Sequence, residues 1–79
     1  MARTRETIGL KTLRQERGST QAELAERAGW KQETVSRLER QLVDTKLSTL
    51  RRYVESLGGE LRLVAVFKGV EKNVDFGRS

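Results

Sequence analysis

The sequence lacks cysteine, histidine and proline altogether, and it has only one tryptophan, one tyrosine and two phenylalanines among 79 residues. Without cysteine the chain can form no disulfide, and without cysteine or histidine we expect no metal site. The absence of cysteine fits a reducing compartment, so we expect a cytoplasmic protein. Histidine and cysteine often serve in catalysis, and no glycine-rich phosphate loop is present, so we expect neither an enzyme nor a bound cofactor.

Long hydrophobic runs are also missing. No apolar run approaches the roughly 18 residues of a membrane span, and no apolar stretch follows the charged residues 1–7, as it would in a secretory signal. We therefore expect no membrane partner. Positive charge is abundant, with 16 lysines and arginines against 11 acidic residues and a net charge of +5. This balance favours a polyanionic partner such as nucleic acid.

Glycines must separate the helices, because there is no proline to do so. Four of the seven glycines mark these breaks, at positions 18, 29, 58 and 59. The apolar spacing between them predicts helices from about residue 4 or 7 to 17, then over 21–28, 32–40 and 47–57. Thr20 and Glu23 form the pattern of a capping box at the start of the second helix. Lys31, before the third helix, is a poor N-cap.

The apolar period changes after the last glycine pair. Residues 61–67 are rich in β-branched and apolar side chains and predict a strand. No other segment has this pattern, and residues 69–79 are polar, which predicts a flexible tail. The predicted fold is therefore mainly α, with one strand near the C-terminus.

The segment 21–40 meets the steric demands of two helices joined by a tight turn, the helix-turn-helix. Ala25 is small where the second helix must cross the first closely. Gly29 stands where the turn requires a positive φ. Apolar residues fall on the inner faces of both helices, and polar ones lie between them. A plain helical hairpin in a small bundle is the alternative.

These residues resemble the Xre family of phage-type repressors, the Cro-type helix-turn-helix proteins. The resemblance spans about residues 10–57 and is carried by TQAELAERAG at 20–29 and TVSRLE at 34–39. The segment 47–61, LSTLRRYVESLGGEL, is similar to antitoxins of the HigA and HipB kind, from toxin–antitoxin systems. The resemblance implies a lambda-repressor-like bundle of four to five helices. The chain departs from the usual pattern at Ser19, Trp30 and Lys31.

The resemblance also implies roles for individual residues. Gln32, Glu33 and Arg37 would face base edges in the major groove, and Lys31, Thr34 and Arg40 would lie near the DNA backbone. Gln21 would hold a phosphate and brace the recognition helix. Arg14 and Glu39 would form a structural salt bridge. An exposed pair of this kind contributes only about 0–1 kcal/mol.

The chemistry of these side chains agrees with the implied roles. A glutamine can form two hydrogen bonds with adenine, and an arginine can do so with guanine. Glu33 can accept from cytosine, or it favours the helix N-terminus electrostatically. The alternative for each exposed side chain is that it only faces solvent and contacts no DNA.

A lone strand would leave a row of unpaired backbone groups. Pairing with the same strand of a second copy would satisfy them, so we predict an antiparallel, two-fold symmetric homodimer. Its strand would be formed by Leu61, Leu63, Val64, Ala65, Val66 and Phe67. Alternatively, the strand packs on its own domain. The predicted organisation is a DNA-binding domain at 1–59, a dimerisation strand at 60–68 and a tail at 69–79.

The sequence thus predicts a DNA-binding transcriptional repressor that binds an inverted-repeat operator. The narrower resemblance implies an antitoxin that represses its own operon and neutralises a partner toxin. The alternatives are a stand-alone phage-type repressor, or a toxin-neutralising protein with little role at DNA.

Overall fold

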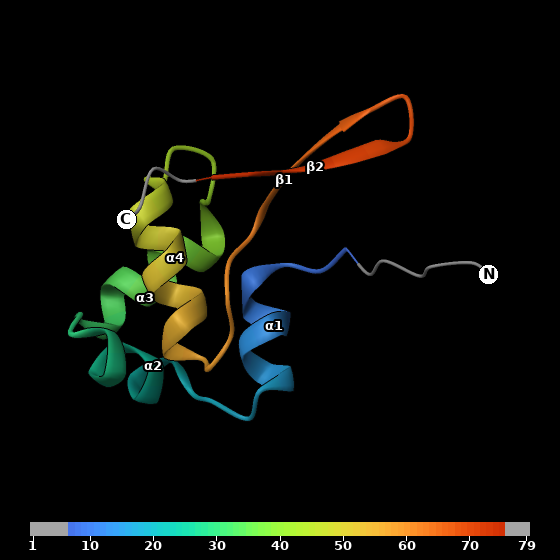
Figure 1. The fold of residues 1–79 in the computed structure, drawn as a ribbon. Helices are drawn as coiled ribbons and strands as arrows, with labels where there is room; N and C mark the ends of the chain where they lie inside the picture. Colours follow the sequence, from blue (N-terminus) through green and yellow to red (C-terminus); the bar gives the residue numbers. More distant parts are fainter. Residues whose placement is uncertain (1–6, 76–79) are drawn as a thin grey trace.

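In the computed structural model, which describes residues 7–75, four short helices precede an antiparallel β-hairpin (Figure 1). The helices gather into one body, and the hairpin extends away from it. This arrangement confirms the predicted helix-turn-helix bundle and gives it four helices. The elements are α1 (Leu10–Glu16), α2 (Gln21–Ala28), α3 (Gln32–Arg40), α4 (Leu47–Ser56), β1 (Leu63–Phe67) and β2 (Val70–Val74).

The helix boundaries follow local chemistry. At the start of α2, the Thr20 hydroxyl accepts from the Glu23 backbone N–H at 3.1 Å, and the Glu23 carboxylate accepts from the Thr20 N–H at 2.9 Å. This is the predicted capping box. Helix α1 begins only at Leu10, with Gly9 as its N-cap. The predicted start at residue 7 was therefore too early, and one at residue 4 lies outside the described residues.

The hydrophobic core lies between α2, α3 and α4. Leu24, Val35 and Tyr53 are fully buried, and each comes from a different helix of the three. Ala25 of α2 is also buried in this cluster, as expected for a small residue at a close helix crossing. Around them pack further buried or partly buried residues, namely Leu10, Leu13, Trp30, Leu38, Val54 and Leu57.

The prediction of a lone strand is wrong. β1 begins at Leu63 rather than Leu61, and it pairs along its length with β2, from Leu63 opposite Val74 to Phe67 opposite Val70. Residues 70–74 are therefore a strand and not a tail. The polar sequence of β2 hid it, because both of its faces are exposed and no alternation of apolar residues marks it.

The hairpin turn explains the close pairing of the two strands. Its central residues, Lys68 and Gly69, have φ of 48° and 83°. Two positive φ values in a two-residue loop characterise the type I′ turn, whose twist matches that of a hairpin. Lysine is not a usual residue at its first position, so this turn signal is weak in the sequence.

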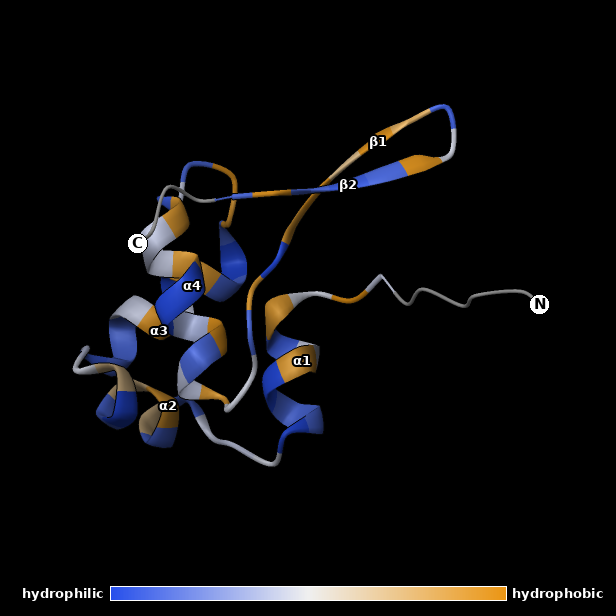
Figure 2. Cartoon of the chain, viewed as in Figure 1, coloured by the Kyte–Doolittle hydropathy of each residue, from blue (hydrophilic) through white to orange (hydrophobic). Residues whose placement is uncertain are grey.

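The hydropathy of the chain differs between the helices and the hairpin. Figure 2 shows hydrophobic and hydrophilic residues alternating along the helices, β1 mostly hydrophobic and β2 mostly hydrophilic. Within residues 7–75, no helix combines the length and the hydropathy that a membrane crossing demands.

Candidate nucleic-acid interface

The turn between α2 and α3 sets the angle of the exposed helix. Gly29 caps α2 in the left-handed conformation, with φ 77°, and the Trp30 N–H donates to the Ala25 carbonyl at 2.9 Å. Ending the helix this way favours glycine, which has no Cβ to clash in this conformation. Trp30 then packs against the core, so the chain enters α3 with one side anchored.

Helix α3 presents its polar side to solvent. Gln32, Glu33 and Arg37 are exposed, as predicted for residues that face base edges. Val35 and Leu38 are buried on the opposite side of the helix and hold it against the core. This division leaves the outer surface of α3 free to enter a groove of DNA.

The residues predicted to lie near the DNA backbone flank that surface. Lys31 precedes α3 and is exposed, and its side chain makes no capping hydrogen bond. Thr34 is half-buried in the first turn. Arg40 is exposed in the last turn, and its guanidinium donates to the Ser36 hydroxyl at 3.1 Å. The two cationic side chains therefore lie at opposite ends of α3.

Gln21 links the start of α2 to both ends of α3. Its Nε2 donates to Glu39 Oε1 at 3.1 Å, and its Oε1 accepts from Gln32 Nε2 at 3.4 Å. The predicted brace between Gln21 and the exposed helix is therefore a pair of side-chain hydrogen bonds. They connect Gln32, at the first residue of α3, to Glu39 near its end.

Arg14 and Glu39 form the expected ion pair, and they are far more buried than expected. Arg14 Nε lies 2.6 Å from Glu39 Oε2, with side-chain exposures of 8% and 4%. The small contribution expected of an exposed pair therefore does not apply. Arg14 also donates to the Ser19 carbonyl at 2.8 Å. Ser19, one of the positions at which the chain departs from the usual pattern, is buried beside this polar group.

Sequence reasoning missed Tyr53, which belongs to the same cluster. Its side chain is fully buried, and its hydroxyl donates to Glu39 Oε2 at 2.7 Å, with the Leu10 carbonyl 3.1 Å away. Burial and the neighbouring Glu39 carboxylate raise the pKa of Tyr53. The spacing of Leu50, Tyr53 and Leu57 was the available signal, because it places all three on one side of α4.

The cluster keeps Glu39 ionised despite its burial. Burial disfavours the charged form, but hydrogen bonds from Arg14, Tyr53 and Gln21 outweigh it and lower the pKa of Glu39. In turn, the hydrogen bond with Glu39 raises the pKa of Arg14. Four helices thus meet at one carboxylate, which fixes α3 relative to the rest of the bundle.

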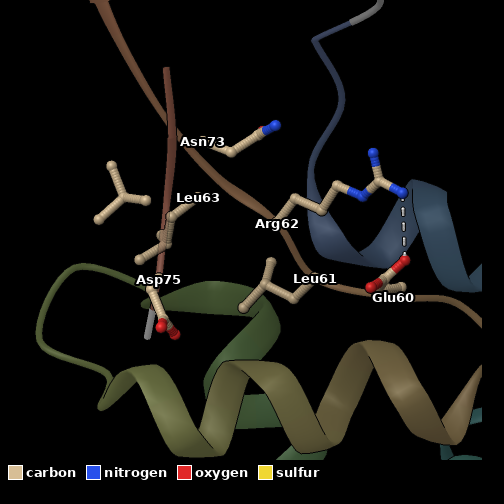
Figure 3. Close-up of a pocket in the computed structure, with 7 residues that line it drawn as sticks. Glu60, Leu61, Arg62, Leu63, Asn73 and Asp75 are labelled. Carbon is tan, nitrogen blue, oxygen red and sulfur yellow. Dashed lines mark hydrogen bonds and ion pairs between the residues drawn. The ribbon is translucent and has the colours of Figure 1, made fainter. Parts of the chain in front are cut away.

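A concave feature lies at the root of the hairpin (Figure 3). This hollow of about 430 Å³ includes the apolar residues Leu61, Leu63 and Val74 in its lining. Beyond it, Val66 and Phe67 are 57% and 66% exposed. Residues 61, 63 and 65 are half-buried within one chain, whereas Phe67 is not buried.

The chain matches the family model described as helix-turn-helix over residues 10–64. It is 51% identical over 45 residues to antitoxin HigA1 of two Mycobacterium tuberculosis strains. That alignment covers 57% of the chain and 30% of those relatives, so the chain spans less than a third of their length.

Two solved structures are similar over nearly their whole length. One is described as DNA-bound antitoxin HigA3, with a TM-score of 0.81 and 35% identity over 95% of this chain and 99% of that one. The other concerns induced DNA bending by unique dimerization of HigA antitoxin. It has a TM-score of 0.78 and 36% identity over 91% of this chain and 97% of that one.

Proposed function

Because the chain belongs to the helix-turn-helix family, we propose that it binds duplex DNA in a sequence-specific way, with α3 in the major groove. The observation that carries the proposal is the construction of α3. Its outer side exposes Gln32 and Arg37, while its inner side is fixed by the core and the buried Glu39 cluster. A rigid helix with free hydrogen-bonding groups is what base recognition requires.

The exposed side chains divide into two classes of contact. Gln32 and Arg37 carry the donors that match purine edges, and Glu33 accepts from cytosine or favours the helix start. Gln21, Lys31, Thr34 and Arg40 contact phosphates, which set the position of the helix without selecting a sequence. The list of base contacts is therefore short, and the phosphate contacts supply much of the affinity.

We propose that the protein acts in the cytoplasm as a transcriptional repressor, and that it is the antitoxin of a toxin–antitoxin pair. The similar HigA antitoxins support this assignment. In this role, DNA binding represses the operon that encodes both proteins, and a second surface binds and neutralises the toxin. The alternative is a stand-alone phage-type repressor without a toxin partner.

In this proposal the protein is a homodimer whose two copies pair through their hairpins. A two-stranded hairpin is at best marginally stable alone in water. Here it extends from the bundle with Val64, Val66 and Phe67 exposed on β1. Pairing β1 with its copy forms a four-stranded sheet and holds two α3 helices in one body. We expect them about 34 Å apart on an inverted repeat.

Selection from a random duplex library tests DNA binding. We expect enrichment of an inverted repeat and an affinity that falls steeply as salt rises. Enrichment of no sequence, with binding set by salt alone, would contradict sequence-specific recognition. Enrichment of a single half-site would contradict the dimer.

Co-expression with the product of the neighbouring gene tests the antitoxin role separately. We expect a small basic protein that arrests growth when expressed alone, and that co-purifies with this chain. Arrest that this chain does not relieve would favour the stand-alone repressor, and it would leave the DNA-binding proposal intact.

A further inference from the structure

Phe67 is the largest apolar side chain that is exposed in the described part of the chain. It is 66% exposed at the tip of the hairpin, and it lies on the same face of β1 as Leu63 and Ala65. Those two residues are half-buried within one chain. The apolar face of β1 is therefore covered at its root and open at its tip.

The hollow at the hairpin root has the shape and chemistry to receive an aromatic ring. Its volume is about 430 Å³, and its lining includes Leu61, Leu63 and Val74 (Figure 3). An apolar cavity of about 150 Å³ already holds a benzene molecule, so a phenyl group fits here. Val74 is opposed to Leu63, and opposed side chains share a face, so both lie on the face of the hairpin that carries Phe67.

Phe67 cannot fill the hollow of its own chain. Four residues separate it from Leu63, and a strand advances about 3.3 Å per residue, so the two Cα atoms lie about 13 Å apart. A second copy that pairs antiparallel with β1 reverses this order, because it brings its tip beside the root of the first copy. Each ring then meets the hollow of the other chain.

The charges at the two ends of the hairpin are also complementary. Glu60 and Asp75 belong to the lining of the hollow, and Arg62, which pairs with Glu60, is the one cation among the residues described there. The lining therefore carries a net negative charge. Lys68, which follows Phe67 at the tip, brings a positive charge to it. Opposite charges around an apolar contact favour one orientation of the two partners.

We propose that the hollow at the root of each hairpin is the binding site for Phe67 of a second copy, so that two copies exchange hairpin tips. The inference rests on the proposed dimer and deepens it, because it names the side chain that anchors the pairing and the site that receives it. Two rings fill two hollows around one two-fold axis. The contact is therefore closed and stops at two copies.

Sedimentation equilibrium of single variants tests this exchange. F67T removes the ring and introduces a β-branched residue that suits a strand. We expect the dissociation constant of the F67T dimer to rise by about a hundredfold or more, because each dimer loses two buried rings. V66T, on the opposite face of the same strand, is the matched control and should change that constant by less than about threefold.

A transfer of the ring to another wall of the hollow gives a second test. In V74F a phenyl group from the chain's own β2 occupies the hollow, so the partner's Phe67 finds no room and the dimer should weaken. In F67T/V74F the hollow is filled from within, and the partner brings a small threonine. We expect this double variant to dimerise more tightly than either single variant. Losses that simply add in the double variant would overturn the exchange.

The outcomes distinguish this inference from the proposed dimer. A wild-type protein that sediments as a monomer overturns the dimer itself. A wild-type dimer that F67T does not weaken overturns only the role of Phe67. Circular dichroism verifies that each variant keeps its helices, and V74F tests the hollow with Phe67 intact.

One other residue of the chain is tested as an occupant of the hollow. Phe76 follows Asp75 directly in the chain and lies outside the described residues. We expect F76A to dimerise like the wild-type protein. A loss in F76A as large as the loss in F67T would assign the hollow to Phe76 and overturn the exchange of tips.

Discussion

Arg14 and Glu39 form two hydrogen bonds where almost no solvent reaches them. In such a place the removal of one partner leaves an uncompensated charge, which costs about 3–5 kcal/mol. We therefore expect R14M to lose about that much free energy of unfolding, measured in urea. The double variant R14M/E39M should recover part of the loss. If the free energy of unfolding of R14M lay within about 1 kcal/mol of the wild-type value, the pair would contribute no more than an exposed pair does. That result would contradict this account.

The protonation of Glu39 links stability to pH. Its pKa is lowered in the folded protein because hydrogen bonds from Arg14, Tyr53 and Gln21 outweigh the effect of burial. Its contribution is therefore complete above the unfolded value of about 4.3, and it is lost as pH falls through the lower folded pKa.

We expect the free energy of unfolding to fall between about pH 5 and pH 3, and to fall less steeply in R14M/E39M. Glu23 shifts in the same direction through its hydrogen bonds with Thr20 and remains in both proteins. The difference between the two pH profiles therefore isolates Glu39. Parallel profiles would show that Glu39 does not take up the proton.

Arg37 has the opposite character to Arg14, since its side chain is exposed on α3. Its replacement should leave the fold intact and weaken binding. We expect R37A to lose about 1–3 kcal/mol on the selected site and to relax discrimination at one base pair. Fluorescence anisotropy measures this loss, with K11A on α1 as a control of equal charge change. Equal affinities for R37A and wild type would exclude Arg37 as a base reader.

The role of a residue could be predicted where the family resemblance assigns that role to a single position. The pairing of Arg14 with Glu39 followed from the resemblance alone, whereas its burial depends on Tyr53 and Ser19, which come from other segments. Spacing within α4 places Tyr53 on the inner side but does not indicate which polar group its hydroxyl will meet. That partner is 14 residues away in the chain, and only the packing of α4 on α3 brings it close.

At the scale of elements, the packing of α2 against α3 depends on Ala25. This residue is 4% exposed and lies in the cluster with Val35 and Leu38 of α3. A25L would place a larger side chain where none fits, at a cost of about 1–3 kcal/mol, and would tilt α3. Thermal unfolding and DNA affinity should both fall. A22L, on the exposed side of the same helix, should change neither.

The helices could be predicted from their apolar spacing, and α3 matched its predicted bounds although its N-cap, Lys31, makes no side-chain cap hydrogen bond. Helix α2 has a capping box at its start and a glycine with positive φ at its end, and its bounds were predicted to the residue. Helix α1 lacks a side-chain cap, so its first turn was placed too early. Strand β2 lacks an apolar face, and its existence depends on pairing with β1, which a local pattern does not reveal.

At the scale of the whole molecule, the proposed dimer places the contact between two copies at the hairpin. The residues that flank a two-residue turn form a hydrogen-bonded pair, and such pairs alternate along the ladder. Phe67 pairs this way with Val70, so the backbone groups of Ala65 point toward β2. The groups of Val64 and Val66 point to the free edge of β1, where a second copy can bind.

A symmetric register can satisfy the groups of both valines. With the two-fold axis at Ala65, Val64 lies opposite the partner's Val66, and each pair exchanges both of its hydrogen bonds. Opposed residues share a face, so the partner's Phe67 lies beside Leu63, next to the hollow at the hairpin root. The two Ala65 residues then form a non-hydrogen-bonded pair with Cα atoms about 4.5 Å apart.

The absence of cysteine makes this register directly testable, because one introduced thiol is the only thiol in the chain. The Ala65 pair falls in the roughly 4.4–6.8 Å Cα range of disulfides. We therefore expect A65C to form a covalent dimer under mild oxidation. In V64C the two cysteines lie two residues out of register, and their Cα atoms are more than about 7 Å apart. We therefore expect V64C to form no cross-link, although sedimentation should still show a dimer. Equal cross-linking of the two variants would overturn the register. A wild-type protein that is monomeric at micromolar concentration would overturn the dimer. Deletion of residues 61–79 should produce a monomer whose helical spectrum stays close to that of the intact chain.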